Sequence, residues 1–310
     1  MFFKVSSELP SINSFDEFSN AISLSKETLY RLWKWNNKHY KEVEIPKKSG
    51  GIRLLACPSK KMKAVQGWIL KNILEKIIIS ENATAYIKNQ SILMNAIPHR
   101  GKKYILAMDV ENYFPSIRYA WVFTIFKKLN YPSNVCHMLT KLTTYKYRLP
   151  QGGVTSPAIS NVVSYRLDRR LSSYAQKLNV SYTRYADDIT YSSNVLNHFN
   201  KLKKFTKKVL REEGFEVNEA KTRILGSKQR RKITGLVLDK GEIRIGKYKK
   251  NELRVLIHKI FTSPDIKEVE RMKSCLEGWF SYLKSVDLVS YQQLMRHYNH
   301  SKIKYMKSPN

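Results

Sequence analysis

The 310-residue chain has few cysteines, no internal repeat, no low-complexity segment and no long apolar run. Its three cysteines, Cys57, Cys136 and Cys275, lie far apart, which fits neither a disulfide framework nor a zinc site with short paired spacings. Apolar stretches such as Ile77–Ile79 are too short to cross a bilayer, and the start of the chain lacks the basic and then apolar segments of a signal peptide. We therefore expect a soluble, cytoplasmic protein that does not span a membrane.

Acidic residues are also scarce. The chain has 25 Asp and Glu against 56 Lys and Arg, a formal net charge of +31, while its 42% of hydrophobic residues are enough to build a core. Such an excess indicates a polyanionic partner. Binding to an anionic membrane surface is the alternative, but the basic residues are interleaved with aromatics and strands and form no single amphipathic helix.

The hydrophobic pattern predicts a mixture of helices and strands. Residues 1–40 repeat apolar side chains at helical spacing, and Lys47–Gly51 separates two alternating runs, which predicts a β-hairpin with a basic tip. Further helices are expected after Ser59, over 118–145, over Ala158–Leu178 with Ser156 as a cap, and through the last 60 residues, where an apolar stripe from Ile266 to Leu283 has basic neighbours. Residues 233–238 and 243–245 are strand-like.

Three carboxylates occupy unusual positions in this basic chain. Asp109 ends a buried strand over 104–108, and Asp187 and Asp188 lie at the predicted tip of a hairpin within 180–192. An Asp-Asp pair in a turn is commonly only a solvated turn element. If the strands are neighbours, however, the three charges repel one another and need a hard divalent cation such as Mg²⁺. Two such ions about 3.5–4 Å apart can activate a hydroxyl and stabilise a leaving phosphate oxygen.

The order of these motifs resembles the palm of reverse transcriptases, and the resemblance covers roughly residues 45–250. The matching segments are Asp109 with Tyr113 and Phe114, Leu149–Gly152, Tyr185–Asp188, and Lys221 within Asn218–Thr222. Within that superfamily the chain is similar to bacterial retron enzymes. Asn95–His99 matches their Asn-Ala-x-x-His element, Ile233–Gly235 differs from their usual Val-Thr-Gly by one side chain, and Gly278–Trp279 and Ser285–Asp287 resemble their thumb.

The resemblance implies an α+β, right-hand polymerase fold with fingers, an antiparallel-sheet palm and a short helical thumb. The expected divisions are an N-terminal helical extension over 1–40, fingers over 41–105, palm over 106–117, fingers and palm helices over 118–145, palm over 146–245 and thumb over 246–310.

It also implies roles for individual residues. Asp109, Asp187 and Asp188 would bind two Mg²⁺ ions, with the Val110 carbonyl as a further ligand. Phe114 would be the steric gate that excludes a nucleotide 2′-hydroxyl, so that the product is DNA. The residues expected to hold the incoming deoxynucleotide are Lys47, Lys48, Arg53, Gln151 and Gly152. Lys221 would protonate the departing pyrophosphate, although a solvated surface lysine is the alternative.

RNA contacts are expected from the retron elements and the thumb. The candidates are Asn95, His99, Thr234, Gly235, Arg254, Lys259, Arg271, Lys273 and Lys284. Each has a simpler alternative. A lone histidine is more often structural, residues 233–238 match a primer-positioning hairpin but equally an ordinary strand pair, and charged helices are usually solvated faces.

A retron-like enzyme would be an RNA-directed DNA polymerase that copies part of its cognate noncoding RNA (msr-msd) from deoxynucleotides, starting at a guanosine 2′-hydroxyl and leaving multicopy single-stranded DNA (msDNA). The resemblance further implies template removal by a host RNase H, since no room for such a domain follows the thumb, and a separate effector protein in antiphage defence. One alternative is a group II intron-like or other bacterial reverse transcriptase, but we expect no DNA-binding and endonuclease extension of the kind found in mobile intron proteins. Another is a non-catalytic RNA-binding scaffold, which would gain nothing from three crowded carboxylates.

Overall fold

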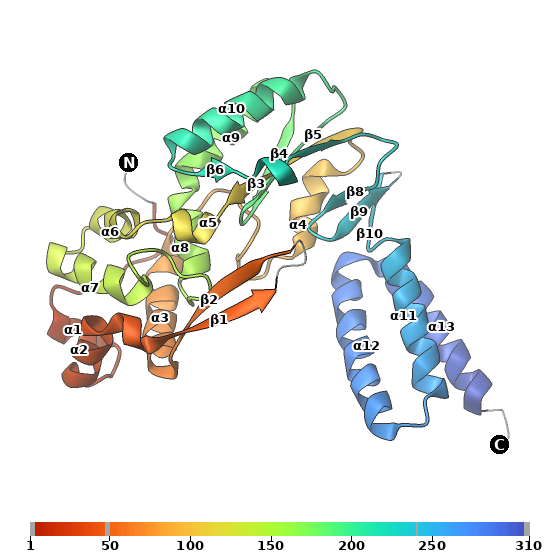
Figure 1. Cartoon of the computed structure of the whole chain (residues 1–310), viewed down its shortest axis with the longest axis horizontal. Coiled ribbons are helices and arrows are strands. Elements are labelled where there is room, and N and C mark those ends of the chain that lie inside the picture. Colours follow the sequence, from red (N-terminus) through yellow and green to blue (C-terminus); the bar gives the residue numbers. More distant parts are fainter. Residues whose placement is uncertain (1–3, 47–49, 240, 307–310) are drawn as a thin grey trace.

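The computed structural model describes residues 4–46, 50–239 and 241–306 (Figure 1). The predicted nucleotide contacts Lys47 and Lys48 lie outside the described residues. The N-terminal part contains α1 (Phe15–Ala21) and α2 (Lys26–Lys34), which begin after the capping hydroxyls of Ser14 and Ser25. A hairpin of β1 (Tyr40–Pro46) and β2 (Ile52–Pro58) follows and points towards the C-terminal helices. The hairpin prediction is confirmed, with longer strands than expected, since Tyr40 pairs with Pro58.

The central element is an antiparallel sheet of order β4-β5-β3-β6, in which β7 also pairs with β3. Its strands are β3 (Tyr104–Glu111), β4 (Ser181–Tyr185), β5 (Asp188–Ser193), β6 (Glu216–Val217) and β7 (Arg223–Leu225). In the β3–β5 register Asp109 lies opposite Asp188. Segments that are far apart in the chain therefore meet at one end of this sheet.

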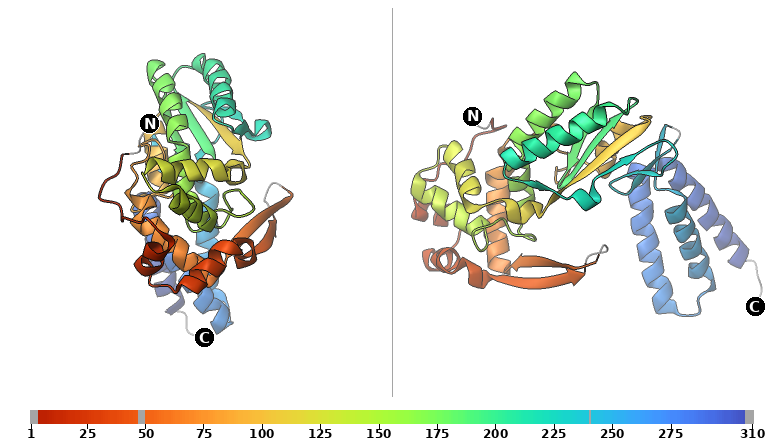
Figure 2. Two further views of the ribbon diagram at one scale, coloured as in Figure 1. Left: turned by 90° about the vertical axis from the view of Figure 1, so that its left-hand side faces the viewer. Right: turned by 45° about the horizontal axis from the view of Figure 1, so that its top comes forward.

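Helices cover the sheet and build the main core with it (Figure 2). They are α3 (Lys60–Asn72), α5 (Tyr113–Ser116), α6 (Tyr119–Lys128), α7 (Ser133–Thr143), α8 (Ser156–Val163), α9 (Tyr165–Lys177) and α10 (His198–Glu212). The short helix α4 (Ile92–Ala96) instead contributes Ala96 to the core of the C-terminal helices. The single helix expected over 158–178 is wrong, because α8 ends at Val163 and α9 begins at Tyr165. Between them the buried Ser164 hydroxyl is hydrogen-bonded to the Tyr113 hydroxyl at 2.8 Å. Thr155, rather than Ser156, precedes the first of the two helices.

A small sheet connects the main body to a C-terminal three-helix bundle. Its strands are β8 (Arg231–Ile233), β9 (Leu236–Asp239) and β10 (Glu242–Arg244), and the helices are α11 (Lys247–Thr262), α12 (Ile266–Val286) and α13 (Leu288–Met306). The expected run over 233–238 is thus two strands joined by a turn, in which Thr234 and Gly235 adopt φ values of 45° and 96°.

The C-terminal bundle has a core of its own, around buried Leu276, Phe280 and Leu283, as the apolar stripe predicted. Ile266, the first member of that stripe, is 75% exposed, because it lies at the far end of α12 beyond the packed helices. Along the described residues, no helix is both long and apolar enough to cross a bilayer. The arrangement of hairpin, antiparallel sheet and helical bundle agrees with the right-hand fold expected from the sequence.

Candidate active site

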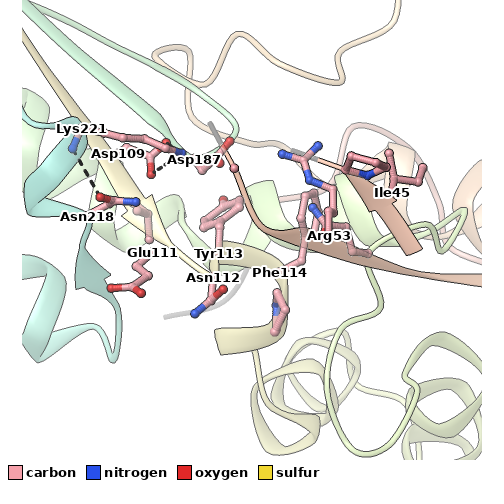
Figure 3. Close-up of a pocket in the computed structure, with 15 residues that line it drawn as sticks. Ile45, Arg53, Asp109, Glu111, Asn112, Tyr113, Phe114, Asp187, Asn218 and Lys221 are labelled. Carbon is pink, nitrogen blue, oxygen red and sulfur yellow. Dashed lines mark hydrogen bonds and ion pairs between the residues drawn. The ribbon is translucent and has the colours of Figure 1, made fainter. Parts of the chain in front are cut away.

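The three predicted carboxylates lie at the same end of the central sheet. Asp109 on β3 and Asp188 on β5 are directly opposite one another in the antiparallel register, which places their side chains on one face about 4.5–5.5 Å apart at Cβ. Asp187 occupies the turn before β5, and its carbonyl accepts the Val110 N–H at 2.9 Å. Asp109, Val110 and Asp187 line one pocket (Figure 3). The expectation that the strands carrying these carboxylates are neighbours is therefore confirmed, while the Val110 carbonyl as a metal ligand stays a prediction.

The electrostatics of these carboxylates call for a cation. Burial raises the pKa of Asp187 above its ordinary value, and the negative charge of Asp109 adds to the effect. Asp188 keeps contact with solvent, but the surrounding protein atoms remove part of its hydration. This loss of hydration, together with the charges of Asp187 and Asp109, raises the pKa of Asp188 to about 6. Ionising all three groups thus costs free energy that a bound cation would offset. Carboxylate oxygens are also the donors that hard divalent ions prefer.

Lys221 provides one positive charge at this site. Its Nζ donates to both carboxylate oxygens of Asp109 at 3.0 Å, from a short 3₁₀ turn, Glu219–Lys221, that the Asn218 side chain caps. Lys221 is therefore ion-paired rather than a free surface lysine. Among the described residues, no group of three acidic, histidine or cysteine side chains is arranged so that it could hold a metal ion. Because Lys221 is ion-paired with Asp109, a metal ion at this carboxylate would compete with the ammonium group.

The turn that carries Asp187 is held in a strained conformation. Ala186 has φ of 57° and is 3% exposed, an unusual backbone state for a residue with a side chain. The Arg184 Nη1 donates to the Ala186 carbonyl at 3.0 Å. Arg184 itself is completely buried, and its Nε and Nη2 each donate to Asp168 on α9 at 2.7 Å. The buried ion pair with Asp168 thereby holds Arg184 in place to support the turn that carries Asp187.

Phe114 reaches the pocket because β3 ends in a left-handed residue. Asn112 adopts φ of 47°, after which α5 turns the chain so that Phe114 forms part of the pocket wall (Figure 3). The neighbouring Tyr113 is buried, and its hydroxyl accepts a hydrogen bond from Arg184 at 2.9 Å. The predicted steric gate and the carboxylates are therefore positioned by the same buried network.

The opposite wall of this pocket of about 610 Å³ comes from the hairpin and a loop. Arg53 on β2 and Gln151 line it, while their contacts with a nucleotide stay a prediction. The Ala56 N–H donates to the Gln151 carbonyl at 2.8 Å. Gly152 is not a lining residue; with φ of 116°, a side chain there would approach the Ala56 carbonyl to 3.1 Å, so the glycine lets the loop lie against β2.

The expected RNA contacts divide into two groups. Asn95 and His99 are 1% and 0% exposed, which indicates structural roles, while RNA contact by these residues stays an untested prediction. Both ring nitrogens of His99 are hydrogen-bonded, at 2.7 Å to the Ser192 hydroxyl and 2.8 Å to that of Thr183, and burial lowers its pKa to about 3. Thr234 and Gly235 lie in the β8–β9 turn. The thumb candidates Arg254, Lys259, Arg271, Lys273 and Lys284 are all exposed, which agrees with a surface role without testing it.

Sequence reasoning missed Tyr86, Asp168 and Arg184. Tyr86 has φ of 63°, and its ring lies 6.2 Å from that of Phe114 and 6.5 Å from that of Tyr185. Although Tyr86 is 49% exposed, the surrounding protein atoms remove part of the hydration of its hydroxyl, and with the charge of Asp187 they raise its pKa to about 12. The signal in the sequence was the run Tyr182–Tyr185, where one arginine stands within a predicted strand of the hairpin.

Comparisons with known proteins agree with this geometry. Residues 45–259 match the family model described as reverse transcriptase (RNA-dependent DNA polymerase). The retron Ec86 reverse transcriptase of Escherichia coli is 37% identical over 97% of this chain and 93% of its own length. The retron Mx65 reverse transcriptase of Myxococcus xanthus is 32% identical over 84% of this chain and 64% of its own length. A telomerase structure from Candida albicans, with a fragment of telomeric RNA, aligns with a TM-score of 0.43 at 10% identity over 95% of this chain and 62% of that one, which is too distant to support an inference.

Because a reverse transcriptase model matches more than half of the chain and a retron enzyme is similar over nearly all of it, the chain belongs to the retron reverse transcriptases, which are RNA-directed DNA polymerases that depend on a divalent metal, a template RNA and deoxynucleotides.

Proposed function

We propose that the chain copies part of its own structured noncoding RNA into msDNA, starting from a guanosine 2′-hydroxyl, by phosphoryl transfer with two Mg²⁺ ions. The observation that carries the proposal is the convergence of Asp109, Asp187 and Asp188 at the end of one sheet, where Asp109 and Asp187 line the same pocket as Arg53 and Phe114. The similarity to retron enzymes over nearly the whole chain supports the choice of RNA.

The residues of the site would share the reaction as follows. The three carboxylates would hold the metal ions, whose chemistry when bound would be to activate the attacking hydroxyl and to stabilise the leaving phosphate oxygen. Arg53 and Gln151 bind the triphosphate and orient it for in-line attack. Phe114 leaves no room for a 2′-hydroxyl. Lys221, held at Asp109 before substrate arrives, is placed to give a proton to the departing pyrophosphate.

The wider role follows from the same similarity. We propose that a host RNase H removes the template, that the RNA–DNA product works with a separate effector protein in antiphage defence, and that the protein acts in the cytoplasm. We also propose that the boundaries between the N-terminal extension, fingers, palm and thumb segments lie after residues 40, 105, 117, 145 and 245.

The test of catalysis compares two acid-to-amide variants. Asp187→Asn should abolish extension of an RNA-templated DNA primer while RNA affinity is retained, because only the metal site is changed. Asp16→Asn, at an exposed ion pair on α1, serves as the matched control and should extend normally. Full synthesis by Asp187→Asn, or no synthesis by the unaltered chain with Mg²⁺, would contradict the proposal.

The identity of the template needs a second experiment. We expect sequencing of nucleic acid that copurifies with the protein to recover a branched RNA joined to single-stranded DNA. Recovery of intron RNA would instead favour a group II intron-like enzyme.

A further inference from the structure

An arginine outside the catalytic pocket shares the sheet face of the carboxylates. Arg223 is the first residue of β7 and lies opposite Ala107 of β3 in the antiparallel register. Residues directly opposite one another point to the same face of a sheet, and so do residues two apart on one strand. Asp109 follows Ala107 by two positions and lies opposite Asp188, and we call these two the carboxylate row. The Arg223 side chain therefore lies on the face of the carboxylate row, one row away from it.

Within the described residues, Arg223 has no ion-pair partner. Its side chain is exposed, and in that part of the chain it forms neither an ion pair nor a hydrogen bond. Lys221, by contrast, is ion-paired with Asp109. Loss of hydration raises the pKa of Asp188, and the charges of Lys221 and Arg223 oppose that rise, so Arg223 is near enough to act on the site. An exposed guanidinium without an ion pair is available to an anion that enters there.

The surface beside Arg223 is open on the side of the carboxylate row and covered on the other. Ile105, two residues before Ala107, is 1% exposed and packs against Ile233 and Leu238 of the small sheet. That sheet lies between the central sheet and the C-terminal bundle (Figure 1). Ala107 is only half-buried, and its small side chain leaves a shallow step in front of the carboxylate row. A polymer strand can lie across this step beside Arg223.

The catalytic pocket extends from the carboxylate row in the opposite direction along the chain. Its lining continues from Asp109 through Phe114 to Pro115, whereas Ala107 and Arg223 do not line it. In an in-line displacement the attacking oxygen and the leaving oxygen are on opposite sides of the phosphorus atom. A triphosphate in the pocket therefore leaves the side of Ala107 and Arg223 to the strand that carries the attacking hydroxyl.

We propose that Arg223 binds a backbone phosphate of the primer strand, at the linkage that precedes the nucleotide whose hydroxyl attacks. The inference rests on the proposed phosphoryl transfer at the three carboxylates. Neighbouring rows on one face of an antiparallel strand are about 6.8 Å apart, a spacing of the order of one nucleotide along a nucleic-acid backbone. A guanidinium pairs with phosphate oxygens through two parallel hydrogen bonds, so Arg223 would fix the position of the primer end without reading its sequence.

The test neutralises the arginine and the phosphate separately. The substrate is a DNA primer annealed to an RNA template, and the last linkage of the primer is either a phosphodiester or an uncharged methylphosphonate. With the phosphodiester, Arg223→Gln should lower kcat/KM for the primer–template by at least about tenfold, since one charged hydrogen-bonded contact is lost. The KM for the deoxynucleotide should not change, because the triphosphate occupies the catalytic pocket.

Two variants control for the arginine itself. Arg223→Lys keeps the positive charge and should recover most of the lost efficiency. Arg31→Gln removes an exposed arginine on α2 and should extend the primer like the unaltered chain. Equal efficiencies for Arg223→Gln and Arg31→Gln would overturn the proposal.

The methylphosphonate identifies the contact. In the unaltered chain it should cost about as much efficiency as Arg223→Gln does, and in Arg223→Gln it should cost nothing further, because both changes remove the same interaction. Losses that multiply would overturn the proposal, since they would show that the arginine acts elsewhere, for example by disturbing the carboxylates. If the unaltered chain does not extend even the normal primer, the proposed function is itself wrong and the inference fails with it, so the two failures are distinguishable.

Discussion

At the scale of single residues, burial determines what the polar groups near the site can do. His99 and Arg184 are both fully buried, yet one is stabilised in its neutral form and the other in its charged form. His99 is kept neutral between two hydroxyl groups, whereas the Asp168 carboxylate keeps Arg184 charged. Residue type alone therefore did not predict their roles, because both roles depend on which partners are folded against them.

Acid should destabilise the protein through His99. The folded state keeps the ring neutral down to its pKa of about 3, while the unfolded chain binds the proton below about 6.5. Stability is therefore complete above pH 6.5 and is lost as the pH falls from there towards 3, by up to about 1.4 kcal/mol per pH unit. Thermal unfolding of His99→Gln, less stable at pH 7, should show a flatter pH dependence. His300→Gln, at an exposed site, is the control and should show the same pH dependence as the unaltered chain. If the melting temperature of His99→Gln also varies with pH in parallel with that of the unaltered chain, His99 is not the group responsible.

Tyr86 should influence sugar selectivity through Phe114. Its ring packs against that of Phe114, so Tyr86→Ala frees the gate to move. We expect discrimination between deoxynucleotides and ribonucleotides to fall by about tenfold, or about 1.4 kcal/mol, and by more in Phe114→Ala. The measurement is the ratio of kcat/KM for the two sugars. Tyr86→Phe keeps the ring and is the control. Unchanged sugar selectivity in Phe114→Ala would show that Phe114 is not the steric gate.

At the scale of secondary structure elements, strands and turns are positioned by contacts that the local pattern does not contain. Alternation and acidic spacing correctly predicted the β4–β5 hairpin and its carboxylates. The same reasoning joined α8 to α9 and β8 to β9. It failed there because a buried hydroxyl at Ser164 and positive φ at Thr234 are stabilised by tertiary packing rather than by neighbouring residues.

The buried pair of Arg184 and Asp168 should be essential to the hairpin turn. Arg184→Met leaves a buried carboxylate without its partner and should lower the free energy of unfolding by about 3–5 kcal/mol. Lys26→Met, which breaks the exposed pair with Asp16, should cost no more than about 1 kcal/mol. Denaturant unfolding compares the two.

A double variant separates stability from catalysis. Arg184→Met/Asp168→Leu removes both charges and should regain stability, yet polymerisation should remain slow because the Ala186 carbonyl has lost its donor. Full activity in this variant would show that the arginine supports the fold alone.

At the scale of the whole molecule, the largest hydrophobic cluster joins the N-terminal helices to the central sheet, and a second lies in the C-terminal bundle and takes in Ala96 of α4. A third, small cluster of Ile105, Ile233 and Leu238 lies between the central sheet and the small sheet. Because the bundle packs around a core distinct from that of the catalytic sheet, we expect it to open locally while the catalytic sheet stays folded.

Leu283→Ala should loosen the bundle selectively. Leu283 is completely buried in the smaller core, and its truncation should cost about 2–5 kcal/mol locally. Hydrogen exchange should accelerate in α11–α13 but not in β3 or β5. Leu288→Ala, 55% exposed, is the matched control. Uniform acceleration across both cores would show that the molecule unfolds as one unit.

The amino-acid sequence by itself determined the basic character of the chain, the order of its acidic and aromatic motifs, and the strand-forming runs that carry Asp109 and Asp188 and flank the turn with Asp187. These are properties of residues close together in the chain, where periodicity and composition act directly. The tertiary structure decided that Lys221 pairs with Asp109, that Arg184 supports the turn, and that Arg223 lies on the sheet face of the carboxylate row. Those outcomes depend on burial and on charges brought together from distant segments, which only folding specifies.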